Sequence, residues 1–152
     1  MAFEVVKQNL LDHGFQVSVF ADGAEAAAYL NACIDGKTVG FGGSITLRDL
    51  GLYEKLKSHN TVYWHMLNGD LEECVPAASA EVYLTSANGL AETGEIINID
   101  GIGNRVASGL YGHRKVYFVI GRNKLAPTYE EALWRARNIA APKNAQRKQV
   151  KT

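Results

Sequence analysis

Short runs of apolar residues alternate along this chain with segments that place apolar side chains at intervals of three and four residues. The first pattern is typical of buried strands, and the second is typical of helices that pack one face on a core. The patterns predict strands over residues 15–20, 37–41, 61–66, 82–84, 95–100 and 116–120. They predict helices over residues 2–13, 22–34, 47–56 and 128–141, with a less regular helix-like segment over residues 71–79. Alternating strands and helices indicate an α/β fold with a mainly parallel sheet covered on both faces.

The ends of two predicted helices carry local signals. Asp22 with Glu25, and Thr128 with Glu131, have the spacing at which a capping residue and a carboxylate three positions later satisfy the first N–H groups of a helix. Pro142 is expected to end the last helix, because proline has no N–H to donate within a helix interior. These signals support the helix boundaries that the apolar pattern gives.

The composition is that of an ordinary soluble globular protein. The chain has 152 residues, of which 47% are hydrophobic and 21% are charged, and its 16 basic residues balance its 16 acidic ones. This length favours a single domain over residues 1–142, followed by a basic tail over residues 143–152. Balanced charge gives no reason to expect nucleic acid or an anionic membrane as a partner. No run is apolar enough to cross a bilayer or to serve as a signal peptide, so a cytoplasmic location is expected.

The cysteines and histidines do not form a metal-binding pattern. Cys33 and Cys74 lie far apart, form no C-x-x-C pair and have no closely spaced histidine, so no metal site is expected. Both cysteines are expected to pack as small apolar side chains. His65, in the predicted strand over residues 61–66, is a candidate catalytic residue. The more common alternative is a partly buried histidine whose ring is satisfied by the backbone.

A strand, a glycine turn and a helix follow one another directly around Gly42 and Gly43. In an open α/β sheet such a junction lies at the carboxyl edge of a strand, where glycines allow backbone N–H groups to approach an anion. Ser44 is expected to contact the ligand. Thr46 is the other hydroxyl of the turn, and it is expected to cap the helix together with Asp49. The turn is neither a Walker A loop nor a complete dinucleotide-binding fingerprint.

The long segment between the predicted strands at Val82 and Val116 is rich in glycine, amides and carboxylates. Connections of this length are uncommon and are often functional. Asn88 and Glu92 follow a buried strand, and they are predicted to face the glycine turn, with Glu92 as nucleophile or general acid–base catalyst. The alternative for Glu92 is an exposed turn residue. Glu95 is expected to alternate with apolar neighbours in a strand.

Three further polar residues are candidates for binding the same anion. Asn104 and Arg105 follow a glycine turn, and an arginine fork suits a carboxylate or a phosphate. The alternative for Arg105 is an internal pair with Asp100 that holds the turn. Lys124 follows the strand over residues 116–120, where it would add positive charge to the same cleft. The sequence therefore predicts that Ser44, Glu92 and Arg105 reach one ligand.

Four motifs together resemble one known family. The segments VGFGGSITL, LTSANGLAETGEIINIDGIGNRVAS, VYFVIGRNKL and ARNIAAPKNAQR occur in the order typical of the LUD (lactate utilisation) domain family and cover the chain almost end to end. The resemblance implies a three-layer α/β/α, Rossmann-like fold related to sugar-phosphate isomerases and coenzyme A transferases. It makes Gly42, Gly43, Ser44 and Thr46 the anion-binding loop. It also places Glu92 where coenzyme A transferases carry their nucleophile.

The resemblance further implies a role in the oxidation of lactate to pyruvate, or in related metabolism of small carboxylates. The partners that it implies are a small anionic metabolite, iron–sulfur redox subunits and other copies of the chain. It assigns no cofactor. Many members of the family continue with a cysteine-rich stretch and one more strand, so this chain is expected to be a truncated form or a short variant. The alternatives are an acyl or sugar-phosphate enzyme that uses Glu92, and a non-catalytic scaffold for the redox subunits.

Overall fold

The computed structural model of the chain describes residues 2–67 and 69–150. The chain forms two compact units, each assembled from separate segments of sequence. Unit 1 comprises Met1–Val19, Ala87–Gly101 and Ile120–Thr152, and unit 2 comprises Phe20–Ser86 and Ile102–Val119. Each unit has helices and a sheet of its own, and the two are described in turn.

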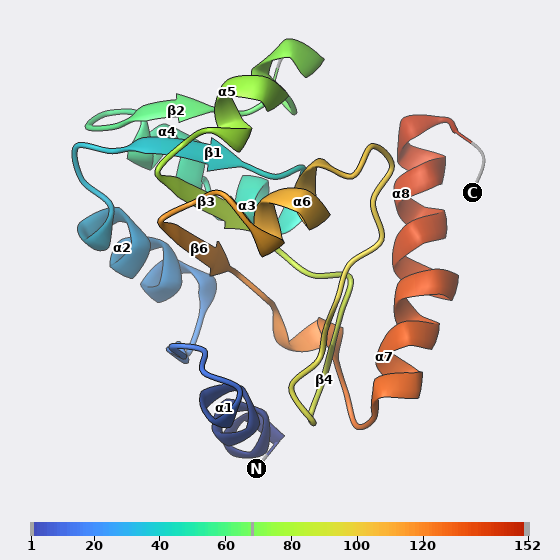
Figure 1. Cartoon of the computed structure of the whole chain (residues 1–152). Coiled ribbons are helices and arrows are strands. Elements are labelled where there is room, and N and C mark those ends of the chain that lie inside the picture. Colours follow the sequence, from blue (N-terminus) through green and yellow to red (C-terminus); the bar gives the residue numbers. More distant parts are fainter. Residues whose placement is uncertain (1, 68, 151–152) are drawn as a thin grey trace. The chain divides into compact units, whose positions relative to one another are not determined.

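Unit 2 is built on a four-stranded parallel sheet (Figure 1). Its strands, in the order β2-β1-β3-β6, are β2 (Thr61–Tyr63), β1 (Thr38–Phe41), β3 (Val82–Thr85) and β6 (Lys115–Phe118). Val39 of β1 is in register with Val62 on one side and with Val82 on the other. All four residues of β3 are buried. The prediction of a mainly parallel α/β sheet is confirmed.

Helices cover both faces of this sheet and give unit 2 three layers. One face carries α2 (Gly23–Cys33), α3 (Ile45–Asp49) and α4 (Leu52–Leu56), which enclose the main hydrophobic core together with Trp64 and strands β1 and β3. The other face carries α5 (Cys74–Ala78), preceded by the 3₁₀ turn η1 (Leu71–Glu73), and α6 (Asn104–Leu110). Gly40 lets α5 approach β1 closely, because a Cβ at this position would lie 2.3 Å from the carbonyl oxygen of Ala77.

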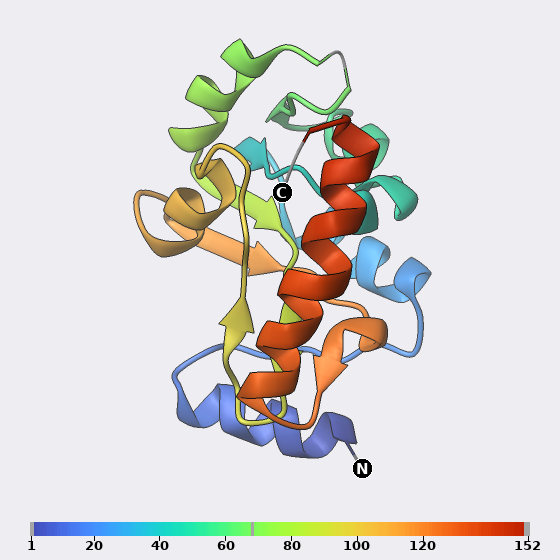
Figure 2. The ribbon, with the colours of Figure 1, turned by 90° about the vertical axis from the view of Figure 1, so that its right-hand side faces the viewer.

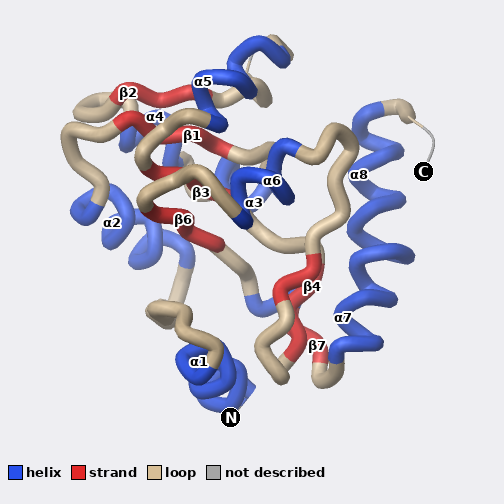
Figure 3. The backbone as a smooth tube through the Cα atoms, in the orientation of Figure 1, coloured by secondary structure: helices blue, strands red, loops and turns tan. Residues whose placement is uncertain are grey.

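Unit 1 contains a smaller, three-stranded sheet (Figure 3). Strand β4 (Gly89–Ala91) pairs antiparallel with β5 (Ile96–Ile97) and parallel with β7 (Leu125–Ala126), which follows the 3₁₀ turn η2 (Arg122–Lys124). Leu90 packs with Val6 and Leu10 of α1 (Ala2–Asp12). Ala91 packs with Ala132 of α7 (Tyr129–Arg135). Helices α1 and α7 thus supply the two small cores that hold this sheet.

Two of the predicted helix starts are confirmed in detail. Asp22 Oδ1 accepts hydrogen bonds from the N–H groups of Ala24 and Glu25, at 2.8 and 3.0 Å, and thereby caps α2. Thr128 Oγ1 accepts a hydrogen bond from the N–H of Glu131 at 3.2 Å and caps α7. Both signals are local, which explains why the sequence alone identifies them.

The predicted end of the last helix at Pro142 is wrong. A π-helical turn, η3 (Ala136–Ala140), follows α7, and α8 (Ala141–Lys148) continues beyond it, so that Figure 2 shows one long rod. Because α8 begins at Ala141, Pro142 lies in its first turn, where a missing N–H removes no hydrogen bond within the helix. Residues 143–148, part of the predicted basic tail, are therefore helical.

The predicted strand over residues 15–20 is also wrong. Phe15 and Val19 are 41% and 46% exposed, and residues 15–20 take no part in either sheet that the structure describes. An apolar–polar alternation makes a strand only where a partner strand and a core face are available.

Several boundaries also differ from the predictions. The helix predicted over residues 47–56 is divided by Gly51, whose φ of 63° is left-handed. The predicted strand over residues 61–66 ends at Tyr63, and that over 95–100 is reduced to Ile96–Ile97. Helix α6 was not predicted, because the sequence NRVASGL contains a glycine and few apolar residues.

Cys33 differs from its prediction as well. It ends α2 and is exposed, whereas a buried, small apolar side chain was expected. Helix α2 buries Ala27 and Leu30 instead, and these lie on one face, three residues apart. Cys74 is partly buried.

Candidate functional site

Gly42 lies directly after β1, at the carboxyl edge of the parallel sheet of unit 2, and its backbone is held from two sides. Its N–H donates to the carbonyl of Leu84 at 2.8 Å, and its own carbonyl accepts a hydrogen bond from Trp64 Nε1 at 3.1 Å. The Trp64 side chain is buried and packs on Phe41 with ring centroids 5.0 Å apart. The start of the glycine turn is therefore fixed in place by the core.

No side chain fits at position 42. A Cβ there would lie 2.8 Å from Thr85 Oγ1, 2.9 Å from Arg105 Cγ and 3.0 Å from the hydroxyl oxygen of Tyr83. Glycine therefore allows two hydroxyl groups and the stem of an arginine to reach the backbone of the turn. The predicted association of the glycine turn with Arg105 is seen here, although the two are far apart in the chain.

His65 borders the second glycine of the turn. A Cβ at Gly43 would lie 3.3 Å from His65 Nε2 and 3.5 Å from the sulfur of Met66. His65 is only 8% exposed, and Ser44, Thr85 and Ser86 are also buried. Buried polar side chains thus gather around the glycine turn, within the region where ligands of open α/β sheets bind.

Ser44 caps α3, and the expectation that Thr46 caps this helix is wrong. Ser44 Oγ accepts a hydrogen bond from the N–H of Leu47 at 3.2 Å, and the backbone of Ser44 is extended, as a capping position requires. The cap therefore lies two residues earlier than predicted, directly after Gly43. Thr46 lies within the first turn of α3 and is partly buried.

Asn104 and Arg105 open α6, whose capping position is Gly103 with a φ of 83°. The stem of Arg105 passes Gly42, whereas the Asn104 amide donates to the sulfur of Cys74 at 3.8 Å. The two neighbours therefore differ, since Arg105 reaches the glycine turn and Asn104 contacts α5. Asp100 belongs to unit 1, and its predicted pairing with Arg105 of unit 2 stays a prediction.

Glu92 lies in the turn of the β4–β5 hairpin of unit 1, as the sequence predicts. Its backbone is held firmly: its N–H donates to Ala126 at 2.9 Å, and its carbonyl accepts from Asn9 Nδ2 at 2.6 Å. Its partly buried carboxylate has no hydrogen-bond or ion-pair partner among the residues that the structure describes. Ser44 and Arg105 belong to unit 2, so the approach of all three to one ligand stays a prediction.

Glu95, expected to alternate with apolar neighbours, lies at the other side of the same turn and is exposed. The Thr93 hydroxyl donates a short hydrogen bond to its carboxylate. This hydrogen bond is the main reason why the pKa of Glu95 lies below its ordinary value. Glu95 is therefore bound within the turn, which distinguishes it from Glu92.

Asn88 and Lys124 belong to unit 1 as well. Asn88 precedes β4, and its Oδ1 accepts a hydrogen bond from the N–H of Ile99 at 2.8 Å. Lys124 is partly buried and ends η2. Whether either residue contacts an anion stays a prediction.

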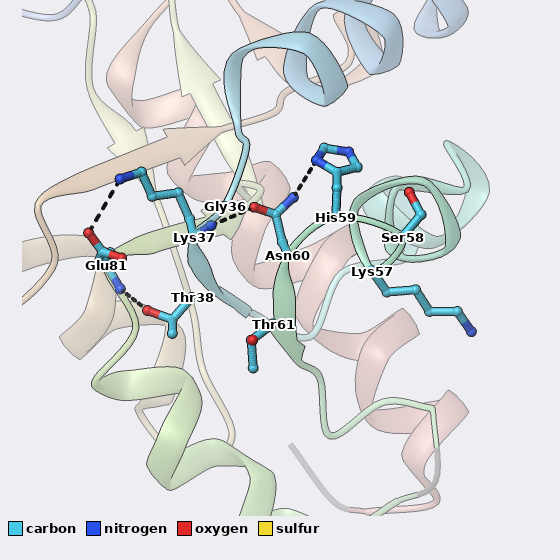
Figure 4. Close-up of a pocket in the computed structure, with 9 residues that line it drawn as sticks. All are labelled: Gly36, Lys37, Thr38, Lys57, Ser58, His59, Asn60, Thr61 and Glu81. Atoms are coloured by element: carbon cyan, nitrogen blue, oxygen red, sulfur yellow. Dashed lines mark hydrogen bonds and ion pairs between the residues drawn. The ribbon is translucent and has the colours of Figure 1, made fainter.

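A second feature of unit 2 is an open hollow of about 450 Å³ at the opposite, amino edge of its sheet (Figure 4). Asn60 holds the middle of this hollow: its Oδ1 accepts from the N–H of Lys37 at 2.8 Å, and its Nδ2 donates to the carbonyls of Ile34 and Leu56, each at 3.0 Å. His59 Nδ1 lies 2.9 Å from Asp35. Lys37, Asn60 and His59 therefore already have protein partners.

The structure also identifies neighbours of the glycine turn that the sequence did not single out. Trp64, Tyr83 and Thr85 contact or surround Gly42, and each lies in a strand or directly after one. The Tyr83 ring stacks on His113 with centroids 4.8 Å apart, and His113 Nδ1 donates to the carbonyl of Ala80 at 2.7 Å. The available signal was that Thr85 directly follows a predicted strand and that Trp64 follows the residues of β2 directly.

Two general properties concern the described part of the chain. No helix formed by residues 2–67 and 69–150 has both the length and the apolar character needed to cross a membrane. Within the same residues, no three His, Cys, Asp or Glu side chains are grouped in a way that could hold a metal ion.

Comparison with protein families gives one result. A family model described as LUD domain matches residues 3–152, which is nearly the whole chain. The predicted resemblance is thereby confirmed. No curated protein and no solved structure matches the chain.

Proposed function

This chain belongs to the LUD domain family, and from that membership we propose that it binds a small organic acid at the glycine turn and acts in lactate utilisation or related metabolism of small carboxylates. The proposed binding residues are Gly42, Gly43, Ser44 and Arg105. The observation that carries the proposal is the crowding at Gly42, where an arginine stem and two hydroxyl groups meet the backbone within contact distance.

The chemistry of these groups suits a carboxylate. Arginine presents several N–H donors in a planar fork that matches a carboxylate, and buried hydroxyls can donate further hydrogen bonds. Their position after β1 is where open parallel sheets bind ligands. Because the surrounding Trp64, Thr85 and Ser86 are buried, a bound anion would be partly shielded from water, which strengthens each of these contacts.

The proposal is tested by titrating the protein with lactate, pyruvate and phosphate in a thermal-shift assay and by calorimetry. A ligand that binds only the folded state raises the melting temperature. Arg105→Gln is expected to weaken binding about tenfold or more, because a hydrogen bond to a charged group is lost. The control is Arg114→Gln, since Arg114 is an exposed arginine of the same unit and should bind as the wild type does. Equal binding by both variants would refute the proposed site.

The half-buried carboxylate of Glu92 favours a second candidate function, acyl transfer. In this reaction a Glu92 oxygen attacks the carbonyl carbon of an acyl-coenzyme A thioester. The new C–O bond forms an anhydride, the C–S bond breaks, and the thiolate of coenzyme A leaves with the electron pair. Hydroxylamine would trap the anhydride on wild-type protein. Glu95→Gln is the matched control for Glu92→Gln, and trapping that survives Glu92→Gln would exclude this function.

The remaining candidate is a non-catalytic scaffold for iron–sulfur redox subunits. Its supporting observation is a set of exposed apolar side chains of unit 2, at Val75, Leu110 and Tyr111, with exposed fractions of 73%, 81% and 90%. Absence of any thermal response to the three anions and to acyl-coenzyme A would favour this candidate over the other two.

A further inference from the structure

Arg135, the last residue of α7, is held in an unusual way within unit 1. Its Nε donates to the carbonyl of Asn123 at 3.0 Å, and its Nη1 donates a short hydrogen bond to the carbonyl of Asn88. The side chain thus joins the residue before β4 to the turn before β7. Burial lowers the pKa of this guanidinium, although an arginine stays charged at neutral pH.

Two small residues bring Arg135 to this place. A Cβ at Gly89 would lie 2.6 Å from the carbonyl oxygen of Ala132, so the glycine allows α7 to pack directly on β4. Arg135 lies three residues after Ala132 and therefore projects from the same face of the helix. This close packing explains how the guanidinium reaches the Asn88 carbonyl.

The helix changes its hydrogen-bond pattern immediately after Arg135. The π-helical turn η3 begins at Ala136, and the N–H of Ala141 donates to the carbonyl of Ala136, five residues earlier. The Asn138 amide donates to the carbonyl of Trp134 at 2.8 Å. A π-helical turn is less stable than a regular helix and occurs frequently at functional sites. The π-helical turn is thus a second observation, independent of the charge, that marks Arg135 as a candidate functional residue.

The charge of Arg135 is only partly compensated. A guanidinium has five N–H donors, and two of the five are used by the carbonyls of Asn88 and Asn123. No carboxylate pairs with it among the residues that the structure describes. Burial of part of the guanidinium weakens its contact with water, and a carboxylate that forms charge-assisted hydrogen bonds with it would offset this loss. Carbonyl dipoles orient this cation but supply no negative charge, so an anionic ligand would complete the site.

We infer that Arg135, which the sequence did not single out, binds the carboxylate of a small organic acid at a site in unit 1. The carbonyls of Asn88 and Asn123 orient its guanidinium, and its remaining N–H donors meet the carboxylate. Lys124 follows Asn123 directly and adds a positive charge in the adjoining turn. All of these residues belong to unit 1, so an experiment can refute binding at this site without refuting the proposed binding at Gly42, and the reverse also holds.

The first test uses the wild-type protein. Phenylglyoxal modifies exposed arginines, and mass spectrometry gives the rate at each position. Sodium lactate is expected to slow the modification of Arg135 several-fold relative to sodium chloride of equal ionic strength. Arg137, exposed two residues later, should react at an unchanged rate. No slowing at Arg135, or slowing by sodium phosphate and not by lactate, would overturn the inference.

The second test uses variants. Arg135→Gln is expected to weaken the binding of lactate at the site in unit 1 about tenfold or more. Arg137→Gln is the matched control and should keep it. In Arg105→Gln, Arg135 should still be protected by lactate even where binding at Gly42 is lost, which separates the two sites. If Arg135→Gln does not fold, the wild-type protection experiment alone decides the question.

Discussion

The two edges of the parallel sheet in unit 2 differ in what their polar groups do. At the amino edge there is an open hollow of about 450 Å³, and Asn60 alone satisfies three backbone groups in it (Figure 4). At the carboxyl edge, buried hydroxyls, an imidazole and the stem of Arg105 crowd around Gly42 and Gly43. The side chains of the hollow hold the starts of strands β1 and β2 in place.

This difference shows that an open space does not by itself indicate a binding site. Asn60 and His59 at the amino edge bind other parts of the same chain, so a ligand would have to compete with them. At the carboxyl edge the polar side chains approach a glycine backbone closely, in the place where parallel sheets bind ligands. We therefore expect substitutions at the amino edge to change stability alone, and those at the carboxyl edge to change binding.

The largest expected effect is on stability, at the amino edge. Asn60→Ala removes three hydrogen bonds and leaves the N–H of Lys37 and the carbonyls of Ile34 and Leu56 without that partner. Each of these hydrogen bonds contributes about 0.5–1.5 kcal/mol net, so the loss of all three should lower the free energy of unfolding by about 3 kcal/mol in urea denaturation. Thr61→Ala, an exposed position of the same edge, should change it by less than about 1 kcal/mol. Weakened lactate binding by folded Asn60→Ala would contradict a purely structural role for the amino edge.

Gly42→Ala should affect both stability and binding. Its methyl group would lie within 3.0 Å of Thr85, Arg105 and Tyr83, so the free energy of unfolding should fall by about 1–3 kcal/mol. Displacement of Arg105 should also reduce the affinity for lactate, measured by calorimetry on the folded variant. Gly101→Ala is the control, because a Cβ there meets no atom within 4 Å. Full affinity in Gly42→Ala would contradict the proposed site.

A smaller effect is expected at the helix cap. Ser44→Ala should lower the free energy of unfolding by about 1 kcal/mol, because the N–H of Leu47 loses its acceptor. Thr46→Ala, which removes a hydroxyl from the same turn without removing the cap, should cost less in the same urea titration. The reverse order would contradict the assignment of Ser44 as the residue whose cap stabilises α3.

The smallest effect concerns Lys57, which lines the hollow at the amino edge. A hydrogen bond with Glu54 raises the pKa of Lys57 above its ordinary value. The raised pKa stabilises the folded state. This contribution is fully present at pH values below the pKa that Lys57 has in the unfolded chain, and it is lost as the pH rises through the pKa that Lys57 has in the folded protein. Because Lys57 and Glu54 are both exposed, water weakens the pair. Glu54→Gln should return the pKa of Lys57, measured by NMR titration, to its ordinary value without changing lactate binding. An unchanged pKa would contradict this pairing.

Local signals allowed much of the fold to be predicted. The caps at Asp22 and Thr128 depend on residues three positions apart, and strands β1 and β3 are marked by their own apolar residues. The strand predicted over residues 15–20 failed because a strand also needs a partner, which a local pattern does not supply. The prediction that the last helix ends at Pro142 failed because a π-helical turn precedes this proline and α8 begins at Ala141.

The candidate site was predictable only in part, for the same reason. The glycine turn is a local signal, so Gly42, Gly43 and Ser44 could be chosen from the sequence. The contact of Gly42 with Tyr83, Thr85 and Arg105 depends on how distant strands and α6 pack, and no local pattern specifies it. Arg135 was not predicted, because its hydrogen bonds to two backbone carbonyls appear only once α7 packs on β4.

The most direct test of binding at the glycine turn is an NMR titration of isotope-labelled protein with lactate, in which the backbone amide of each residue is followed. We predict saturable shifts at Gly42, Gly43 and Ser44, with no shifts at Lys37 and Asn60 beyond those caused by sodium chloride. Shifts at the amino edge without shifts at the glycine turn, or no saturable shift at either edge, would contradict this prediction.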